Sequence, residues 1–160
     1  MKNTILIRKF CPDDLETLRW ITVASFGGVA LEQVLEQRLG LWDEGRDWQA
    51  RKADHIDDDC GSNPEGVFVA ELDGTIVGYI TTRVDRTNQR GRIPNMAVTE
   101  AARGMGLGRR LIHHALDYFR EEGLKVAQIE TMASNAVGQH LYPSCGFQEM
   151  DRQVHYAMRL

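Results

Sequence analysis

Two stretches rich in β-branched and aromatic residues, 67–72 and 75–80, lie on either side of the dipeptide Asp73-Gly74. An Asp-Gly pair readily adopts the positive φ angles of a tight turn, so this pattern predicts a β-hairpin. Elsewhere apolar and polar residues alternate, as they do in a strand with one buried face. The further strands expected from this alternation are 4–10, 93–98, 125–132 and two within 147–160.

The clearest helical pattern is at 107–122, where apolar residues recur with a period of about 3.6 residues and Gly123 ends the helix. Residues 42–64 show no pattern from which an element can be predicted. The mixture of an early hairpin with a later strand–helix–strand unit predicts an α/β or α+β fold with a mixed sheet. Other helices are expected directly after Asp14, at 29–41 and at 135–143.

The composition excludes several classes of protein. The chain has 160 residues without a change in composition, so we expect one domain over residues 1–160. Its net charge of −4 argues against binding to nucleic acid, which needs a basic face. No apolar run approaches the length of a membrane span, and the N-terminus does not resemble a secretory signal, so a cytoplasmic protein is expected. Three cysteines, an odd number, exclude a fully paired set of disulfides.

The most informative segment is Arg103-Gly-Met-Gly-Leu-Gly-Arg-Arg110, which lies between an expected strand and the long helix. Glycines let a ligand approach the backbone, and the first turn of a helix offers unpaired N–H groups to an anion, most often a phosphate. The segment is neither a GxxxxGK[ST] loop nor a GxGxxG fingerprint, which argues against nucleoside triphosphates and dinucleotides. The alternative is a glycine-rich helix start without a ligand, which would weaken the helix for no structural gain.

Two motifs of this chain are similar to those of the GCN5-related N-acetyltransferase (GNAT) superfamily. The first is Arg103, Gly106 and Gly108, which match an Arg-x-x-Gly-x-Gly signature at a strand-to-helix turn. The second motif consists of Asn135, Gly138, Leu141-Tyr142 and Gly146-Phe147, with Gly138 where the family usually has Ala. A further difference is Glu100-Ala-Ala102, where the family often has Pro-Glu-aromatic. The resemblance covers about residues 66–150 well.

This resemblance implies a single-domain acyl-CoA N-acyltransferase fold with about seven strands in a mixed sheet flanked by helices. It also implies acetyl-CoA as the acetyl donor, with its pyrophosphate on the loop amides and its pantetheine arm beside 96–98. Asn135 would hold a pantetheine amide or a water, besides its ordinary use as a helix cap. The cofactor-binding residues expected on this basis are Met96, Ala97, Val98, Arg103, Gly104, Met105, Gly106, Leu107, Gly108, Arg109 and Asn135.

Acetyl transfer to an amine needs a base near the amine and benefits from a proton donor near the leaving sulfur. The resemblance assigns these roles to Glu130 and Tyr142, whose separation of twelve residues is similar to that in the ribosomal-protein alanine N-acetyltransferases. The alternatives are an exposed or ion-paired strand glutamate and a packed aromatic ring. Glu71 and Asp85 compete for the role of base. A nucleophilic role for Cys145 is disfavoured because no histidine or carboxylate partner is evident in the sequence.

The sequence leaves the acetyl acceptor open between a small-molecule amine, a protein N-terminus and a lysine. The other class of function is a non-catalytic acyl-CoA-binding sensor or scaffold, which would need the glycine loop but neither Glu130 nor Tyr142. His113 with Asp117, and His55 among aspartates, supply too few ligands for a metal site, so no metal is expected. The resemblance also implies a homodimer as one form of assembly. Neither a nucleic-acid nor a membrane partner is expected, in view of the net charge and the lack of a long apolar run.

Overall fold

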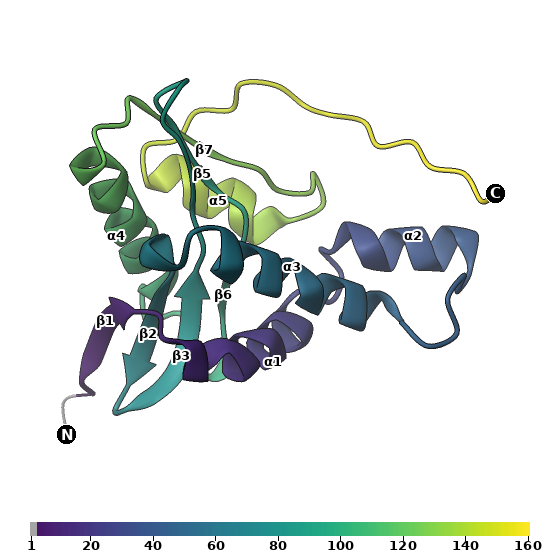
Figure 1. Cartoon of the computed structure of the whole chain (residues 1–160), viewed down its shortest axis with the longest axis horizontal. Helices are drawn as coiled ribbons and strands as arrows, with labels where there is room; N and C mark the ends of the chain where they lie inside the picture. Colours follow the sequence, from purple (N-terminus) through teal and green to yellow (C-terminus); the bar gives the residue numbers. More distant parts are fainter. Residues whose placement is uncertain (1–2) are drawn as a thin grey trace.

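The computed structural model describes residues 3–160 and contains seven strands and five α-helices within them (Figure 1). The strands are β1 (Ile5–Lys9), β2 (Phe68–Leu72), β3 (Thr75–Ile80), β4 (Arg83–Asp85), β5 (Arg90–Ile93), β6 (Met96–Val98) and β7 (Val126–Ile129). The helices are α1 (Leu15–Ser25), α2 (Leu31–Leu39), α3 (Trp48–Ser62), α4 (Leu107–Glu121) and α5 (Ala136–Ser144). No helix among the described residues is long and apolar enough to cross a membrane.

The strands form two adjoining sheets. β3 and β4 are two parts of one interrupted strand, β5 and β6 are two parts of another, and each of these strands passes from one sheet to the other. The first sheet has the order β1-β2-β3-β6 and is antiparallel, and the second has the order β4-β5-β7. Only two residues separate β3 from β4, and only Pro94 and Asn95 separate β5 from β6. The Thr81 N–H donates to the Asn95 carbonyl over 2.9 Å and joins the two interruptions. Since β7 runs parallel to β5, the arrangement confirms the mixed sheet predicted from the sequence.

β7 and β6 are not paired with each other, so the two sheets separate where the pairing of β7 with β5 ends. β7 pairs with β5 in the register Arg90↔Val126 to Ile93↔Ile129, while β6 forms the edge of its own sheet. Pro94 lacks the N–H that a continuous ladder needs, which explains why the predicted strand 93–98 is broken at this point. One edge of β6 is therefore free of strand pairing within the part of the chain that the structure describes.

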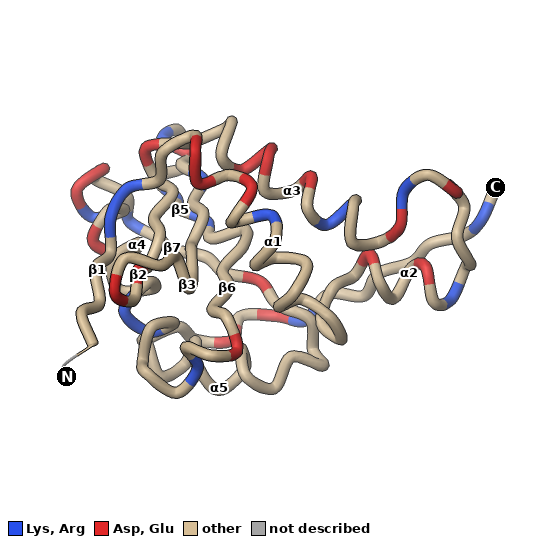
Figure 2. The backbone as a smooth tube through the Cα atoms, turned by 90° about the horizontal axis from the view of Figure 1, so that it is seen from below, with Lys and Arg blue, Asp and Glu red and all other residues tan. Residues whose placement is uncertain are grey.

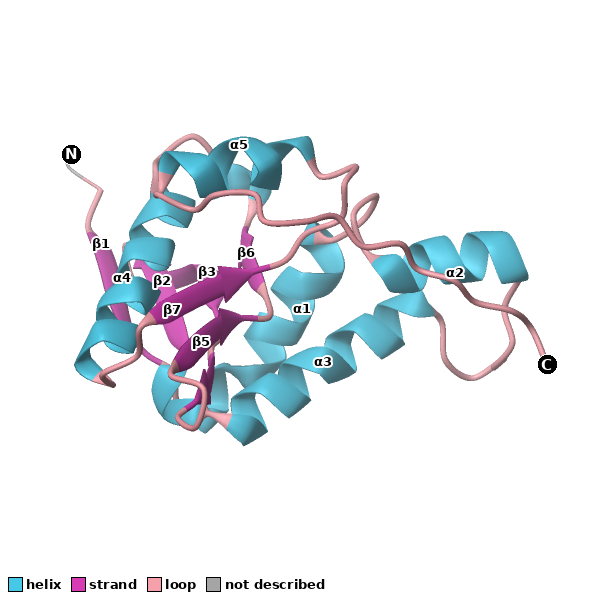
Figure 3. Ribbon diagram, turned by 90° about the horizontal axis from the view of Figure 1, so that it is seen from above, coloured by secondary structure: helices cyan, strands magenta, loops and turns pink. Residues whose placement is uncertain are grey.

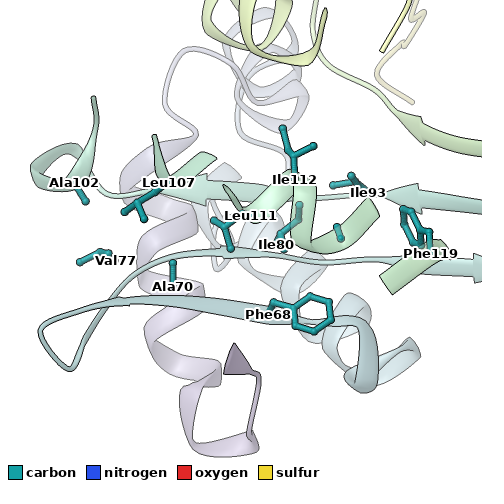
Figure 4. Close-up of a cluster of buried hydrophobic side chains, with 11 residues drawn as sticks. Phe68, Ala70, Val77, Ile80, Ile93, Ala102, Leu107, Leu111, Ile112 and Phe119 are labelled. Atoms are coloured by element: carbon teal, nitrogen blue, oxygen red, sulfur yellow. The ribbon is translucent and has the colours of Figure 1, made fainter. Parts of the chain in front are cut away.

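Helices cover both faces of the sheet (Figure 3). α4 packs on one face, where Leu107, Leu111, Ala115 and Phe119 lie in the predicted helical period and are buried. These side chains meet those of β2, β3 and β5 in one apolar cluster (Figure 4). Burying a large aliphatic side chain contributes about 1.5–3 kcal/mol, so this cluster fixes α4, and the loop before it, against the sheet.

The other face carries α1 and α3, whose buried side chains pack against β2, β3 and β6. α3 lies in the segment 42–64, in which no element was predicted. It begins at Asp47, whose side chain accepts a hydrogen bond from the Ala50 N–H over 2.9 Å. Ala53, Ile56 and Cys60 recur at helical spacing on its inner side and are buried. Four aspartates on the same helix interrupt its hydrophobic pattern, so the apolar stripe is not recognised from the sequence (Figure 2).

The two strands predicted within 147–160 are absent, and this prediction is wrong. Residues 148–160 are exposed and extended, and they run from the end of α5 towards α2 (Figure 1). The alternation of Val154, Tyr156 and Met158 gives the segment one apolar face, but a strand also needs a neighbour for its backbone groups. Within residues 3–160 no strand pairs with this segment, and its end is held by a hydrogen bond from Arg159 to the Leu39 carbonyl over 3.1 Å.

Candidate functional site

The glycine loop before α4 has a backbone that favours glycine at two positions. Gly104 has φ +77° and Gly106 has φ +75°, both in the left-handed region that other residues adopt only with strain. Gly106 is the N-cap of α4, and no side chain caps this helix end. The N–H groups of the first turn therefore remain available, and together with the helix dipole they form a site for an anion.

Three elements converge beside this loop. A methyl group placed on Gly108 would lie 3.2 Å from Cδ2 of Leu141 and 3.9 Å from Cε of Met96. The first turn of α4, the helix α5 and the strand β6 thus meet at Gly108. The absence of a side chain at this position lets the two helices approach closely at the end of the loop. The structure therefore brings both motifs of the sequence to one place.

The arginines of the loop lie on the surface. Arg103 follows a short 3-10 turn, Glu100–Ala102, and is exposed. Arg109 is also exposed, and its Nη1 donates to the Ser144 carbonyl at the end of α5 over 3.2 Å. Two guanidinium groups beside uncapped helix amides fit the phosphates of a coenzyme A molecule. Leu107 is buried in the core, so it can contact such a ligand only through its backbone.

Strand β6 offers backbone groups to an extended ligand. The register Gly78↔Val98 to Ile80↔Met96 joins it to β3, and among residues 3–160 no strand pairs with its opposite edge. Ala97 is buried among the side chains of α1 and α3, whereas Met96 and Val98 pack towards α4. Edge N–H and C=O groups are suited to the amides of a pantetheine arm, which would add to the sheet like a further strand.

Tyr142 on α5 is half-buried beside the same region. Its ring packs edge-on against Phe147, with the ring centroids 6.4 Å apart. Burial raises the pKa of its hydroxyl, and the neighbouring side chain of Thr131 opposes this shift. A phenol with a raised pKa keeps its proton at neutral pH, as a general acid must before the reaction.

Asn135 caps α5, as the sequence allowed. Its Oδ1 accepts a hydrogen bond from the Gly138 N–H over 3.1 Å, and its Nδ2 donates to Oγ1 of Thr131 over 2.8 Å. The side chain is thus fully oriented by the protein itself. Thr131 was not singled out by sequence analysis, because a threonine after a strand has no distinguishing signature.

Glu130 follows β7 directly and is exposed. Its Oε1 lies 3.0 Å from Nε of Arg92, and Gln128 donates to the same oxygen over 3.3 Å. Arg92 and Gln128 are partners in the register of β5 and β7, so all three side chains share the face opposite to Phe119. The structure thus shows Glu130 both exposed and ion-paired, which was the alternative named from the sequence, and it identifies the partner as Arg92.

The two competing carboxylates are engaged elsewhere. Glu71 pairs with Nε of Arg8 over 2.8 Å on β1 and β2. Asp85 accepts hydrogen bonds from the backbone and side chain of Asn88, which hold its pKa below the usual value. Among the carboxylates considered, Glu130 alone is next in sequence to a residue, Thr131, whose side chain lies near Gly138 together with that of Tyr142.

A buried polar cluster fixes the break between β5 and β6. Asn95 accepts from Nζ of Lys52 over 2.7 Å and donates to Oδ2 of Asp59 over 2.7 Å. Asp59 also accepts from Thr81 over 2.8 Å and pairs with Arg83 over 2.9 Å. The cluster ties α3 to the point where the sheet opens. Within residues 3–160, no group of three or more His, Cys, Asp or Glu side chains is arranged to hold a metal ion.

Solved structures share this fold. The ribosomal-protein-S18-alanine N-acetyltransferase of Escherichia coli superposes with a TM-score of 0.68 at 22% identity, over 92% of this chain and 80% of that one. The PaiA N-acetyltransferase of Thermoplasma acidophilum, solved in complex with coenzyme A, superposes with a TM-score of 0.75 at 19% identity. That match covers 94% of this chain and 93% of the other. Both similarities concern the fold.

Sequence relatives are more informative. The mycothiol acetyltransferase of Thermomonospora curvata is 34% identical over 152 residues, which are 95% of this chain and 47% of that protein. The mycothiol acetyltransferase of Tsukamurella paurometabola is 30% identical over 140 residues, 82% of this chain and 41% of that protein. The chain thus spans less than half the length of these relatives. The model of the acetyltransferase (GNAT) family matches residues 30–147, and with both motifs in place the chain belongs to this family.

Proposed function

We propose that residues 1–160 act as one N-acetyltransferase domain, which transfers the acetyl group of acetyl-CoA directly to a primary amine. The observation that supports this most strongly is the convergence of the uncapped loop at Gly106, the unpaired edge of β6 and the half-buried Tyr142. The first fits the pyrophosphate and the second fits the pantetheine amides. The acetyl thioester would then lie where β6 and β7 separate, next to Tyr142.

In this reaction the amine nitrogen bonds to the carbonyl carbon, and the carbon–sulfur bond breaks. Glu130 is the proposed base, and it takes a proton from the amine through water. Its position directly after β7, where Arg92 and Gln128 hold its carboxylate, supports this role. An alkyl amine is mostly protonated at neutral pH, with a pKa of about 10.4 for a lysine side chain, so removal of a proton must precede attack.

Tyr142 is the proposed acid, and it donates its hydroxyl proton to the sulfur as the thiolate leaves. The raised pKa of the hydroxyl supports this assignment, because the group remains protonated until a stronger base forms next to it. The nitrogen loses a second proton to solvent after the attack, and solvent returns a proton to Tyr142, so one proton is released overall for each protonated amine that is acetylated. A covalent acetyl-enzyme on Cys145 is not needed in this scheme.

The acceptor belongs to the primary amines. The names of similar proteins range from mycothiol acetyltransferases to an acetyltransferase for a ribosomal protein's alanine, which act on a small molecule and a protein respectively. We therefore propose a primary amine as the acceptor group. A screen of α-amino peptides, lysine peptides, polyamines and amino sugars determines which kind of molecule carries it. Release of thiol from acetyl-CoA, measured with each amine, identifies the class.

The experiment that tests this function is the substitution Tyr142→Phe, assayed with the best acceptor from that screen. We expect kcat to fall by about 10²-fold or more, with the dissociation constant for coenzyme A unchanged, because the variant loses a general acid and no binding surface. Tyr118→Phe is the matched control, since Tyr118 lies near the C-terminal end of α4, away from the glycine loop, and its hydroxyl contacts Asn63. An unchanged kcat in Tyr142→Phe would contradict the acid role, and binding of acetyl-CoA without turnover of any amine would favour a non-catalytic module.

A further inference from the structure

The apolar core is covered incompletely on the side of β7 and α5. The buried apolar side chains of the two clusters all lie between Leu18 and Phe119, and the described chain has none within residues 120–160. Ile129 and Phe147 pack against the larger cluster but are only partly buried. Apolar surface that is left half-exposed in this way is stabilised when a further element packs on it.

The outer edge of β7, which is the edge away from β5, pairs with no strand of residues 3–160. Because β5 and β6 are two parts of one strand, this outer edge is distinct from the edge of β6 to which we assign the pantetheine arm. The two faces of the sheet differ here: Ile129 pairs with the buried Ile93, whereas Gln128 pairs with the exposed Arg92. A strand that continues the sheet at this edge therefore needs apolar and polar side chains in alternation.

Residues 148–160 have the pattern of such a strand and belong to no sheet of the described chain. Val154, Tyr156 and Met158 share one face of the extended backbone and are 70%, 92% and 75% exposed. His155 lies on the other face, which is polar there. Groups of exposed large apolar side chains mark interaction sites, so this face also calls for a partner.

The segment 148–160 runs to α2 and does not pair with its own β7. Nη1 of Arg159 donates to the Leu39 carbonyl over 3.1 Å. α2 lies at one end of the molecule, apart from the sheet, and the last residues lie beside it in both views (Figure 1, Figure 3). A second copy of the chain has the same unpaired outer edge, and it offers the alternation that the segment matches.

We propose that the segment 148–160 adds as a strand to the outer edge of β7 in a second copy of this chain, while the segment of that copy adds to β7 of the first. Exchange of an identical element between two copies closes with two-fold symmetry, so neither edge is left unpaired. The face with Val154, Tyr156 and Met158 then covers the half-buried side chains of β7 and α5. The polar face continues the side of the sheet that carries Arg92.

The test compares Tyr156→Asp with Tyr156 intact, by sedimentation velocity over a series of protein concentrations. We expect the wild type to form a dimer, with twice the chain mass of 18.1 kDa. Tyr156→Asp should weaken the dimer at least about 100-fold, because each dimer then contains the charge twice on an apolar face. Tyr156 is exposed within one copy, so the variant should keep its far-ultraviolet circular dichroism. His155→Asp, on the polar face, is the control and should leave the dimer intact.

Amide hydrogen exchange distinguishes the exchanged strand from other contacts. The amides of residues 152–158 should be protected in the dimer, and this protection should be lost on dilution below the dissociation constant and in Tyr156→Asp. A monomeric wild type, or a dimer that Tyr156→Asp leaves intact, would overturn the proposal. Protection that does not change on dilution would also overturn it, since the segment would then pair within its own chain. All these readouts are independent of acetyl transfer, so they do not depend on the proposed function.

Discussion

At the scale of single residues, the buried carboxylate of Asp14 stabilises the fold through the hydrogen bonds that it accepts. Nη1 and Nη2 of Arg8 donate to its two carboxylate oxygens over 2.8 and 3.0 Å, and the Cys11 N–H donates as well. These partners, Arg8 above all, lower the pKa of the carboxyl from its usual value of 3.8. A carboxyl with a depressed native pKa stabilises the fold at a pH above its unfolded pKa, and this contribution is lost as the pH falls through the native pKa.

We therefore predict that Asp14→Asn lowers the free energy of unfolding by roughly 1–3 kcal/mol at neutral pH, because charge-assisted hydrogen bonds are replaced by weaker ones. The difference from the wild type should shrink as the pH falls below 3.8. Urea titrations at several pH values measure both effects. Asp13→Asn, at the exposed neighbouring position, should have little effect. A difference that stays constant down to low pH would contradict the account of this ion pair.

Site residues with a recognisable spacing can be predicted from the sequence, whereas residues that act through tertiary contacts cannot. Gly106, Asn135 and Tyr142 stand out because they belong to motifs, and the structure places all three near one end of α4. Arg92 contacts Glu130, but this contact exists only after β7 has paired with β5. Pairing across a sheet is non-local, and one sequence without a structure does not display it.

At the scale of elements, α3 shows why hydropathy alone missed a helix. Lys52 and Asp59 are buried polar residues on its inner side, so the apolar stripe is interrupted where the helix meets the sheet. Both side chains join the cluster around Asn95, which replaces apolar packing by hydrogen bonds. The helix is thus held by a satisfied polar network in addition to the apolar cluster, and such networks are costly to leave half-satisfied.

We predict that Asp59→Ala lowers the free energy of unfolding by about 3–5 kcal/mol, because Arg83, Thr81 and Asn95 lose a shared buried acceptor. Chemical denaturation of the variant measures the change. Asp58→Ala removes the exposed aspartate one position earlier and should cost less than about 0.5 kcal/mol. Similar losses in both variants would show that the cluster does not hold α3 against the sheet.

At the scale of the whole molecule, the mixed sheet and most of the order of elements were predicted from periodicity, and they agree with the structure. Besides α3 and the short strand β4, which were not predicted, the differences lie where a strand depends on a partner. Residues 147–160 alternate like a strand, yet in the structure 148–160 pair with no strand of the described chain. The segment 93–98 reads as one strand, yet Pro94 and the cluster at Asn95 divide it, and this division opens the sheet beside β6.

The central claim is that the loop before α4 binds coenzyme A through its backbone, and calorimetric titration with coenzyme A tests it most directly. Gly106 and Gly123 lie at the two ends of α4, both have φ +75°, and neither has a neighbour that a Cβ would strike. A valine at either position therefore imposes similar strain. We predict that the wild type and Gly123→Val bind coenzyme A alike, while Gly106→Val binds at least about tenfold more weakly, a loss of about 1.4 kcal/mol. No binding to the wild type, or equal affinity in both variants, would contradict the account.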